Sequence, residues 1–454
     1  MSTDDPTQQI ALAGHPRGLP TLFLTEMWER FSYYGMRALL VLYMTQSLGF
    51  ADAKALSIYG YYTSAAYFMP MLGGWLADRF FGSKRAVLIG GIVIACGHFS
   101  LALPWLPFFY GGLVLVATGT GLLKPNVSTM VGDLYAENDP RRDSGFSIFY
   151  MGINLGAFIA PLVCGYLGQR INWHYGFAAA GVGMCFGLVQ FVFSGRRLEN
   201  VGQLKTNPKN RKETGGAEHL TAEEIKRLLV ICILFFFSIV FWMAFEQSGS
   251  SLTLLADRLT RNSLFGYQFP STWFQSVQPV CLLILAPVFA QLWLRMGYRQ
   301  PGSARKFAFG LLFVGLGFAT LVYASTLTSS GHVNPFWLIG LYLIHTIGEL
   351  CLSPVGLSTV TKLSPARMVG MMMGVWFLSI SIGSFLAGKV ASYFDDRSVT
   401  SLVKLFGFLA LAPIGAAILL TVLTPRINRL LQRRDGTHAD GKLVFDEVVE
   451  GVSG

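Results

Sequence analysis

Long apolar stretches recur along the chain and are separated by short polar or Gly/Pro-rich breaks. Most hold about 20 or more residues, the length with which an α-helix crosses the hydrocarbon core of a bilayer. We place twelve spans at 21–48, 56–79, 84–104, 108–131, 144–168, 174–195, 228–256, 270–296, 305–327, 335–361, 367–394 and 400–424. The alternation typical of a membrane β-barrel does not occur, so the pattern predicts an all-α polytopic membrane protein.

The spans fall into two sets of six. We assign 1–20 to an N-terminal segment, 21–195 to a first six-helix bundle, 196–227 to a linker, 228–424 to a second six-helix bundle and 425–454 to a tail. The linker is too short and too polar for two additional spans. Near its end, Thr221-Ala222-Glu223-Glu224 matches a capping box, which we expect to open a short surface helix.

Lys and Arg residues gather in the breaks on one side of the predicted membrane region. These breaks lie near 79–85, 141–142, 195–227, 295–306 and 362–367, and the tail after 425 is basic as well. The positive-inside rule makes this side cytoplasmic, so both termini and the linker are expected in the cytoplasm. The predicted location is a plasma membrane, the inner membrane of a bacterium, with the protein in contact with the lipid bilayer.

The composition agrees with a membrane protein, because 52% of residues are hydrophobic and 13% are charged. The mean hydropathy is +0.49. A net charge of +10 would suggest nucleic acid as the partner of a soluble protein, but here the basic residues report orientation, and no nucleic-acid partner is expected. The six cysteines lie inside apolar spans without ligand spacing, so we expect them to pack and expect no metal site.

Charged residues interrupt the first span. Glu26, Glu29, Arg30, Tyr33 and Arg37 follow the spacing i, i+3, i+4, i+7, i+11, which places them on one face of a helix. A charge at the bilayer centre costs about 2.5 to 3.5 kcal/mol, so this face is expected to turn inward and to mark an ion or substrate pathway. The alternative is a charged cluster at the mouth of the helix, in the interface.

Five other polar or aromatic residues stand out in the spans: Lys124, Asn154, Glu246, Glu349 and Trp376. Each alone is compatible with an ion pair, a helix–helix hydrogen bond or an interfacial Trp. Together they indicate an asymmetry, because the first half supplies Arg30 and Lys124 as cations whereas the second supplies Glu349 as an anion. A cavity between the halves would suit a zwitterion.

The break after the second span reads GGWLADRFFGSKR over 73–85. It resembles the loop motif between the second and third spans of the major facilitator superfamily. Glycines such as Gly74 and Gly82 permit a tight turn, while Asp78 and basic residues such as Arg79 can pair with neighbouring helix ends and stabilise one conformation. These four residues form a candidate gating loop; a solvated turn without a gating role is the alternative.

Two longer motifs point to one family within that superfamily. Residues 26–35 read ExxERFxYYG and residues 146–156 read FSxFYxxINxG, with shorter matches at 124–126, 245–247, 274–276 and 348–350. The chain therefore resembles the proton-dependent oligopeptide transporter (POT/PTR2) family. The resemblance implies the major facilitator fold, with twelve transmembrane helices in two six-helix bundles and without the two extra helices of many bacterial relatives.

The resemblance also implies a function, namely proton-coupled import of di- and tripeptides by alternating access. Protons are then the coupling ion, no cofactor is needed, and the chain is expected to act as a monomer and not as an enzyme. The alternative on the same fold is a proton-coupled carrier of nitrate, a modified peptide or a peptide-like drug. No HExxH, GxSxG or repeated filter loop supports an enzyme or a channel.

The resemblance also implies roles for individual residues, which we assign where a position of this chain matches the family's motif. The implied substrate-binding residues are Arg30, Tyr33, Tyr34, Tyr67, Lys124, Asn154, Trp242, Gln278, Glu349, Ser353 and Trp376. The implied proton-coupling residues are Glu26, Glu29, Arg30, Arg37 and Glu246. Among these, Arg30 and Lys124 would hold the peptide carboxylate, Glu349 its amino terminus, and Glu246 would act as a proton-responsive partner of Arg37 near the outer gate.

Three positions leave questions open. Gln278 stands where the family pattern usually has Asn before Pro, which puts side-chain preference there in doubt. His345 lies four residues before Glu349 and would share its helix face, and His98 also lies within a span. A neutral, packed histidine and a proton relay are both compatible with these positions.

Overall fold

The computed structural model describes residues 10–11, 14–136, 139–199, 201–203, 220–264, 266–365 and 368–431. The first bundle consists of α1 (Gly18–Leu42), α2 (Asp52–Leu76), α3 (Ser83–Leu101), α4 (Leu106–Asp133), α5 (Arg142–Tyr166) and α6 (Trp173–Phe193). The second consists of α7 (Ala222–Phe245), the short α8 (Ser251–Arg258), α9 (Val277–Met296), α10 (Ser303–Leu327), α11 (Phe336–Leu363), α12 (Val369–Ala391) and α13 (Val399–Leu431). The all-α prediction is confirmed.

Ten helical segments are long and apolar enough to cross a membrane, with α7 and α8 forming one of them. The two remaining long helices are α1, which carries the charged face, and α2, which contains four tyrosines. Together they make the expected twelve. Among the described residues, the strands form two short antiparallel pairs, β1 (Ile10–Ala11) with β2 (His15–Pro16) and β3 (Ser263–Leu264) with β4 (Tyr267–Gln268).

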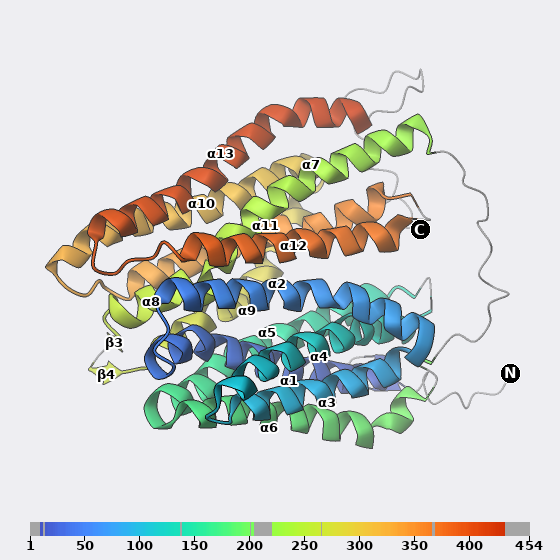
Figure 1. Cartoon of the computed structure of the whole chain (residues 1–454). Coiled ribbons are helices and arrows are strands. Elements are labelled where there is room, and N and C mark those ends of the chain that lie inside the picture. The colour runs from blue at the N-terminus through green and yellow to red at the C-terminus, as the bar shows by residue number, and fades with distance from the viewer. Residues whose placement is uncertain are drawn as a thin grey trace, which may run out of the picture.

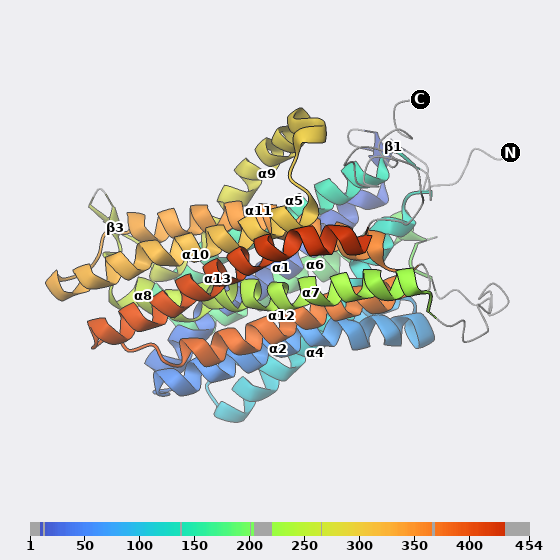
Figure 2. The ribbon, with the colours of Figure 1, turned by 90° about the horizontal axis from the view of Figure 1, so that it is seen from above.

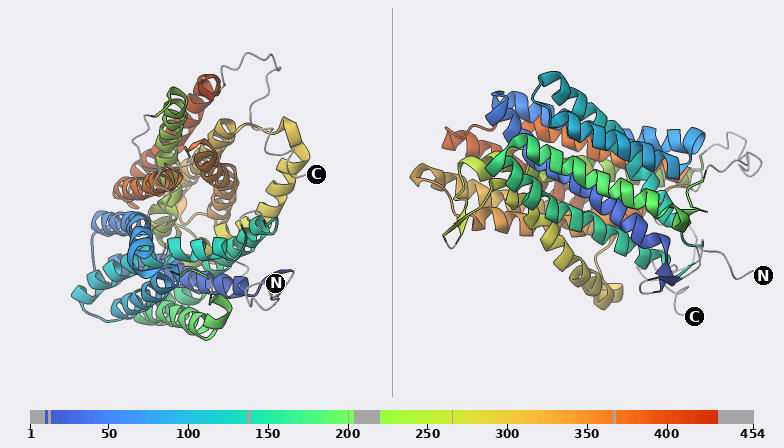
Figure 3. Two further views of the ribbon diagram at one scale, coloured as in Figure 1. Left: turned by 90° about the vertical axis from the view of Figure 1, so that its right-hand side faces the viewer. Right: turned by 90° about the horizontal axis from the view of Figure 1, so that it is seen from below.

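The two bundles lie side by side, with α1–α6 in one and α7–α13 in the other (Figure 1). Between them α2 packs against α12, and α5 packs against α9 and the preceding 3-10 helix η7 (Ser271–Ser276). At one end of the molecule α1 begins, α6 ends, α7 begins and α13 ends, and we call it the linker end. The opposite end is called the far end. Helix α9 leans away from the other helices toward the linker end (Figures 2 and 3).

The capping box at Thr221 forms, but it does not open a short surface helix. The Thr221 side chain accepts a hydrogen bond from the Glu224 backbone and the Glu224 side chain accepts one from the Thr221 backbone, so α7 itself begins at Ala222. Helix α7 therefore starts inside the stretch expected to be linker. Two side chains from the start of that stretch, Leu198 and Val201, are buried in the core of the first bundle.

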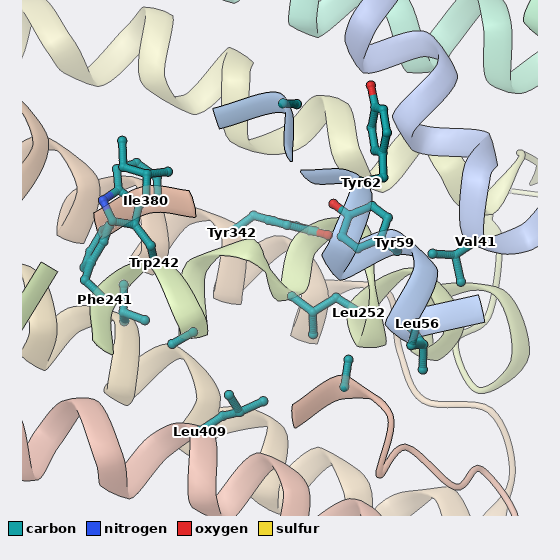
Figure 4. Packing of buried hydrophobic residues seen from close by; sticks show 14 of the residues in the cluster. Val41, Leu56, Tyr59, Tyr62, Phe241, Trp242, Leu252, Tyr342, Ile380 and Leu409 are labelled. Carbon is teal, nitrogen blue, oxygen red and sulfur yellow. The ribbon is translucent and has the colours of Figure 1, made fainter. Parts of the chain in front are cut away.

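The largest hydrophobic core runs through both bundles. It includes Tyr59 and Tyr62 of α2, Trp242 of α7 and Ile380 of α12. Figure 4 shows Tyr342 of α11 pointing its hydroxyl toward Tyr59 across the boundary between the bundles. An aromatic side chain of the second bundle therefore meets α2 at the boundary between the bundles.

Close helix approaches depend on glycine. A Cβ at Gly156 of α5 would meet the backbone carbonyl of Met27 and the Cβ of Arg30 in α1. Between the bundles, a Cβ at Gly60 of α2 would meet the backbone of Gly388 in α12 at 2.8 Å. In a membrane, where apolar burial gives little drive, small residues allow such contacts. The glycine at 156 sets the position of the charged face of α1.

Candidate functional site

The charged face of α1 is turned into the protein. Glu26, Glu29, Arg30, Tyr33 and Arg37 are all buried. The Arg30 guanidinium lies 3.3 Å from the Glu26 carboxylate and is hydrogen-bonded to both oxygens of Glu29, at 2.6 Å between Nη2 and Oε1. One guanidinium thus contacts two buried acids of the same helix face.

Several buried polar atoms beside this cluster have no hydrogen-bond partner among the described residues. They are Glu26 Oε2 and the hydroxyls of Tyr33 and Tyr62. The Tyr33 ring lies under the Arg30 guanidinium at 5.1 Å and stacks with Tyr62 at 6.3 Å. A buried polar group without a partner costs about 1 to 3 kcal/mol, so these atoms are poised to bond to a group that enters the site.

Lys124 of α4 joins the same region. Its ammonium lies over the Tyr67 ring at 4.7 Å and within electrostatic range of Arg30, Glu29 and Glu26. Unlike Arg30, Lys124 has no carboxylate within ion-pair distance in the described part of the chain. Its ammonium is therefore free to form an ion pair with an anionic group that enters the site.

Arg37 joins the two bundles. It lies 2.6 Å from the Glu246 carboxylate, and both side chains are buried. Arg37 also donates to the Tyr59 hydroxyl at 2.6 Å and to Ser248 Oγ at 3.1 Å. Glu246 lies where α7 gives way to a 3-10 turn (Glu246–Gly249), so the seventh span is interrupted and not continuous as expected.

Glu349 of α11 faces this arrangement from the second bundle. It accepts a hydrogen bond from the side-chain amide of Gln278, at the start of α9. The Tyr34 hydroxyl lies within electrostatic range of Arg30, Arg37, Glu246 and Glu349. The structure therefore brings the cations of α1 and the acid of α11 around one tyrosine.

The remaining predicted binding residues are placed as follows. Asn154 is buried in α5 and uses its amide NH₂ on the Tyr150 backbone carbonyl, which leaves its side-chain oxygen as an acceptor. Trp242 is buried with its indole N–H unpaired among the described residues. Trp376 packs on Gly356 inside the second bundle, and Ser353 lies one turn beyond Glu349, partly buried.

The predicted gating loop lies at the linker end. A Cβ added at Gly74 would lie 3.8 Å from the Cβ of Pro125 in α4, which is an ordinary contact. Gly82 has a φ of 73°, a backbone conformation that favours glycine. Asp78 and Arg79 are exposed, and Arg79 lies over the ring of Trp75. The basic residue that contacts a helix end is Lys84, which donates to the carbonyls of Gly195 and Leu198. A gating role stays a prediction.

Both membrane histidines are buried. His345 Nε2 lies 3.2 Å from the Val314 carbonyl, and its ring contacts Phe318 at 4.9 Å. His98 has no hydrogen-bond partner among the described residues. The contacts of His345 are those of a packed side chain, and none of them reaches Glu349.

Sequence reasoning missed three residues of the site. Tyr59 binds Arg37, Tyr342 points toward Tyr59, and an added Cβ at Gly249 would collide with the Tyr59 hydroxyl and approach Arg37 Nε at 2.9 Å. Gly249 follows Glu246 in the segment EQSG, where a glycine in a polar break was the available signal. No sequence signal marks Tyr59 or Tyr342, because their partners come from other helices.

Comparisons with known proteins all point to the same protein family. A family model described as "POT family" matches residues 84–214 and 209–407. The chain is 41% identical to the uncharacterized transporter YclF of Bacillus subtilis, over 93% of this chain and 96% of that protein. It is 33% identical to a di-/tripeptide transporter of Lactococcus lactis subsp. cremoris, over 92% and 97%.

The fold agrees with these relatives. The crystal structure of a peptide transporter POT in complex with sulfate superposes with a TM-score of 0.87 at 39% identity. The match covers 95% of this chain and 99% of that chain. The two-bundle arrangement is therefore shared over nearly the whole length of both chains.

Proposed function

Because this chain belongs to the POT family, we propose that it is a proton-coupled symporter that imports di- and tripeptides by alternating access. Protons are its coupling ion, and the chain works as a monomeric carrier and not as an enzyme. The di-/tripeptide transporter of Lactococcus lactis, which the chain matches over nearly its whole length, supports this choice of solute.

The observation that carries the proposal is the arrangement around Tyr34. Arg37 lies over the Tyr34 ring at 5.6 Å, and the charges of Arg30 in the first bundle and of Glu349 in the second both act on the Tyr34 hydroxyl. A peptide carries a carboxylate at one end and an ammonium at the other. An anion-binding cation and a cation-binding acid on opposite bundles are complementary to those two ends, whereas nitrate has no use for Glu349.

Proton coupling follows from the way in which Arg30 is shared. When a peptide carboxylate binds to Arg30 and Lys124, Arg30 is less available to Glu26 and Glu29. A buried carboxylate that loses its cation takes up a proton more readily, so peptide binding and protonation favour one another. One proton that moves inward across 100 mV releases about 2.3 kcal/mol, which can drive uptake against a gradient.

The membrane orientation is part of the proposal. The basic breaks make the linker end cytoplasmic and the far end the outer end of a bacterial inner-membrane protein. Arg37 and Glu246 connect the bundles on the far-end side of the site. The described conformation then corresponds to a carrier whose outer end is closed.

Reconstitution tests the proposal. Purified protein in liposomes should accumulate labelled dialanine when the outside is more acidic than the inside, and only equilibrate it without a gradient. Unlabelled tripeptide should compete with dialanine, whereas nitrate should not. Accumulation of nitrate but not of dialanine, or uptake that ignores the pH gradient, would contradict the proposal.

A further inference from the structure

A second polar network joins the bundles at the outer end, apart from Arg37 and Glu246. We call it the outer clasp, and its residues are Gln46, Gln169, Asp257, Ser271 and Thr272. The two glutamines belong to the first bundle, in the π-helical turns that end α1 (Tyr43–Ser47) and α5 (Leu167–Ile171). The other three belong to the second bundle, in α8 and η7.

Asp257 accepts hydrogen bonds from both bundles. Gln46 Nε2 donates to its Oδ2 at 2.6 Å. Gln169 Nε2 at 3.2 Å and Ser271 Oγ at 2.7 Å donate to its Oδ1. All three donors are uncharged, so the carboxylate is held by hydrogen-bond geometry and not by a cation.

Gln169 uses both ends of its amide on the second bundle. Its Oε1 accepts from the Thr272 backbone N–H at 3.1 Å and from Thr272 Oγ1 at 2.9 Å. Its Nε2 donates to Ser271 Oγ at 2.8 Å as well as to Asp257. Ser271 and Thr272 are buried. Only an amide side chain offers an acceptor and two donors without a charge, so Glu or Lys cannot replace this pattern.

The residue after Asp257 extends the contact to another part of the first bundle. Arg258 binds both oxygens of Asp52, at 2.7 and 2.8 Å, and lies 3.1 Å from Asp396. Asp52 begins α2, and Asp396 lies between α12 and α13. Consecutive residues of α8 are thus held by three helices of the first bundle, α1, α2 and α5.

We propose that the outer clasp is a second closure of the outer end, which must open before a solute enters from outside, and that Gln169 and Asp257 are the residues that position it. The inference rests on the alternating-access function proposed above. In π-helical turns, which occur often at functional sites, an extra residue shifts the side chains of a helix end. Here such turns direct both glutamines at the second bundle.

The clasp should set a conformational equilibrium. A single hydrogen bond contributes about 1 kcal/mol net, which is about fivefold in population. Gln169 and Asp257 each make several such bonds, so loss of either residue should raise the outward-open population at least about fivefold without unfolding the protein. Gln169 bonds directly to Asp257, so their effects should not be independent. The variant with both residues replaced should raise the outward-open population by less than the product of the two fold-changes measured for the single variants.

Distances between spin labels test this. Labels go on cysteines at Ala53 in α2 and Ser330 after α10, two exposed positions at the outer end, in a background without the six native cysteines. Gln169→Ala, Asp257→Ala and the double variant should enlarge the long-distance population. Gln300→Ala is the matched control, because among the described residues the Gln300 side chain bonds only to Lys306, which belongs to the same bundle.

Gln169→Glu is a second, size-matched variant. Its carboxylate faces Asp257 and cannot donate to Ser271, so it should enlarge the long-distance population at least as much as Gln169→Ala. Distance distributions equal to those of Gln300→Ala for both single variants would overturn the proposal, as would a double variant equal to the product of the singles. The distances do not depend on the solute, so failed dialanine uptake would count against the proposed function and not against the clasp.

Discussion

Glu29 is fully buried, with 0% of its surface exposed, and both of its oxygens bind Arg30. Glu29→Gln keeps the shape but cannot bind a proton. We expect this variant to lose proton-driven accumulation of dialanine and to keep counterflow, because exchange of peptide for peptide needs no net proton movement. Liposome uptake with and without a pH gradient separates the two activities.

A matched control for Glu29 is Glu199, an exposed acid after α6. Glu199→Gln should accumulate dialanine as the unaltered protein does. If Glu29→Gln also retained full accumulation, the coupling role of Glu29 would be wrong.

Asp139, in the loop between α4 and α5, gives a second prediction. Hydrogen bonds from Arg141 hold the pKa of its carboxyl at about 2, and Arg141 in turn donates to the Gly14 carbonyl in the N-terminal segment. Because the folded pKa is lowered, the pair stabilises the fold above the unfolded value of about 3.9 and loses this effect as the pH falls toward 2.

Thermal unfolding in detergent tests the pair. The difference in melting temperature between the unaltered protein and Asp139→Asn should be constant from pH 7 to 5 and should shrink below pH 4. A difference that disappears already near neutral pH would show that another group titrates there.

At the residue scale, helical spacing could predict the members of the charged face, and the family resemblance implied the pairing of Arg37 with Glu246, which the structure contains; the other partners could not be predicted. The spacing from Glu26 to Arg37 was sufficient, because a helix repeats every 3.6 residues and charges avoid lipid. The bonds from Arg37 to Tyr59 and from Gln278 to Glu349 depend on how helices cross. No local pattern encodes such crossings.

At the scale of secondary-structure elements, the close approach of α5 to α1 depends on one glycine. Gly156 lies against the Met27 carbonyl and the Arg30 Cβ. Gly156→Ala should push the helices apart, because overpacking costs about 1 to 3 kcal/mol. We expect a lower melting temperature and a raised KM for dialanine, since Arg30 moves with α1.

Gly111→Ala is the control for this helix contact. Gly111 lies in α4 with nothing within 4 Å of an added Cβ. There alanine removes only the cost of glycine in a helix, about 1 kcal/mol, so stability should stay equal or rise. A Gly156→Ala variant that behaves like Gly111→Ala would show that α1 and α5 tolerate a wider spacing.

Element boundaries were harder to predict than the elements themselves. The apolar runs gave all twelve spans, because each must satisfy its backbone within one helix. The capping box at Thr221 was visible, yet its helix proved to be α7 itself, since the apolar run could extend backwards through Leu228 and Ile225. The break at Glu246 is marked by no proline, and its one signal is the glycine in the polar segment Glu246–Gly249.

At the scale of the whole molecule, the polar contacts between the bundles among the described residues lie at mid-span or at the far end. Ser64 and Ser381 bond in the middle of α2 and α12, and Ser276 bonds to the Phe158 carbonyl. Beyond these lie Arg37 with Glu246 and the outer clasp. Alternating access then requires these contacts to break as a group, so the strength of the buried ion pair should govern the equilibrium.

A buried ion pair that loses one partner is more costly than a pair that is removed entirely. Arg37→Ala leaves the Glu246 carboxylate buried without a cation, which should destabilise the described conformation by about 3 to 5 kcal/mol. Adding Glu246→Gln removes that charge and should restore part of the loss. The melting temperature in detergent should therefore be lower for Arg37→Ala than for the double variant.

The same pair of variants should separate closure from folding. Outer-end spin labels should report a larger open population in Arg37→Ala than in the double variant, because separating the bundles hydrates the unpaired carboxylate while the neutral amide gains less from water. Equal populations in both variants would mean that the ion pair stabilises the fold without controlling the outer end. In that case, closure would have to depend on the uncharged contacts that surround the pair.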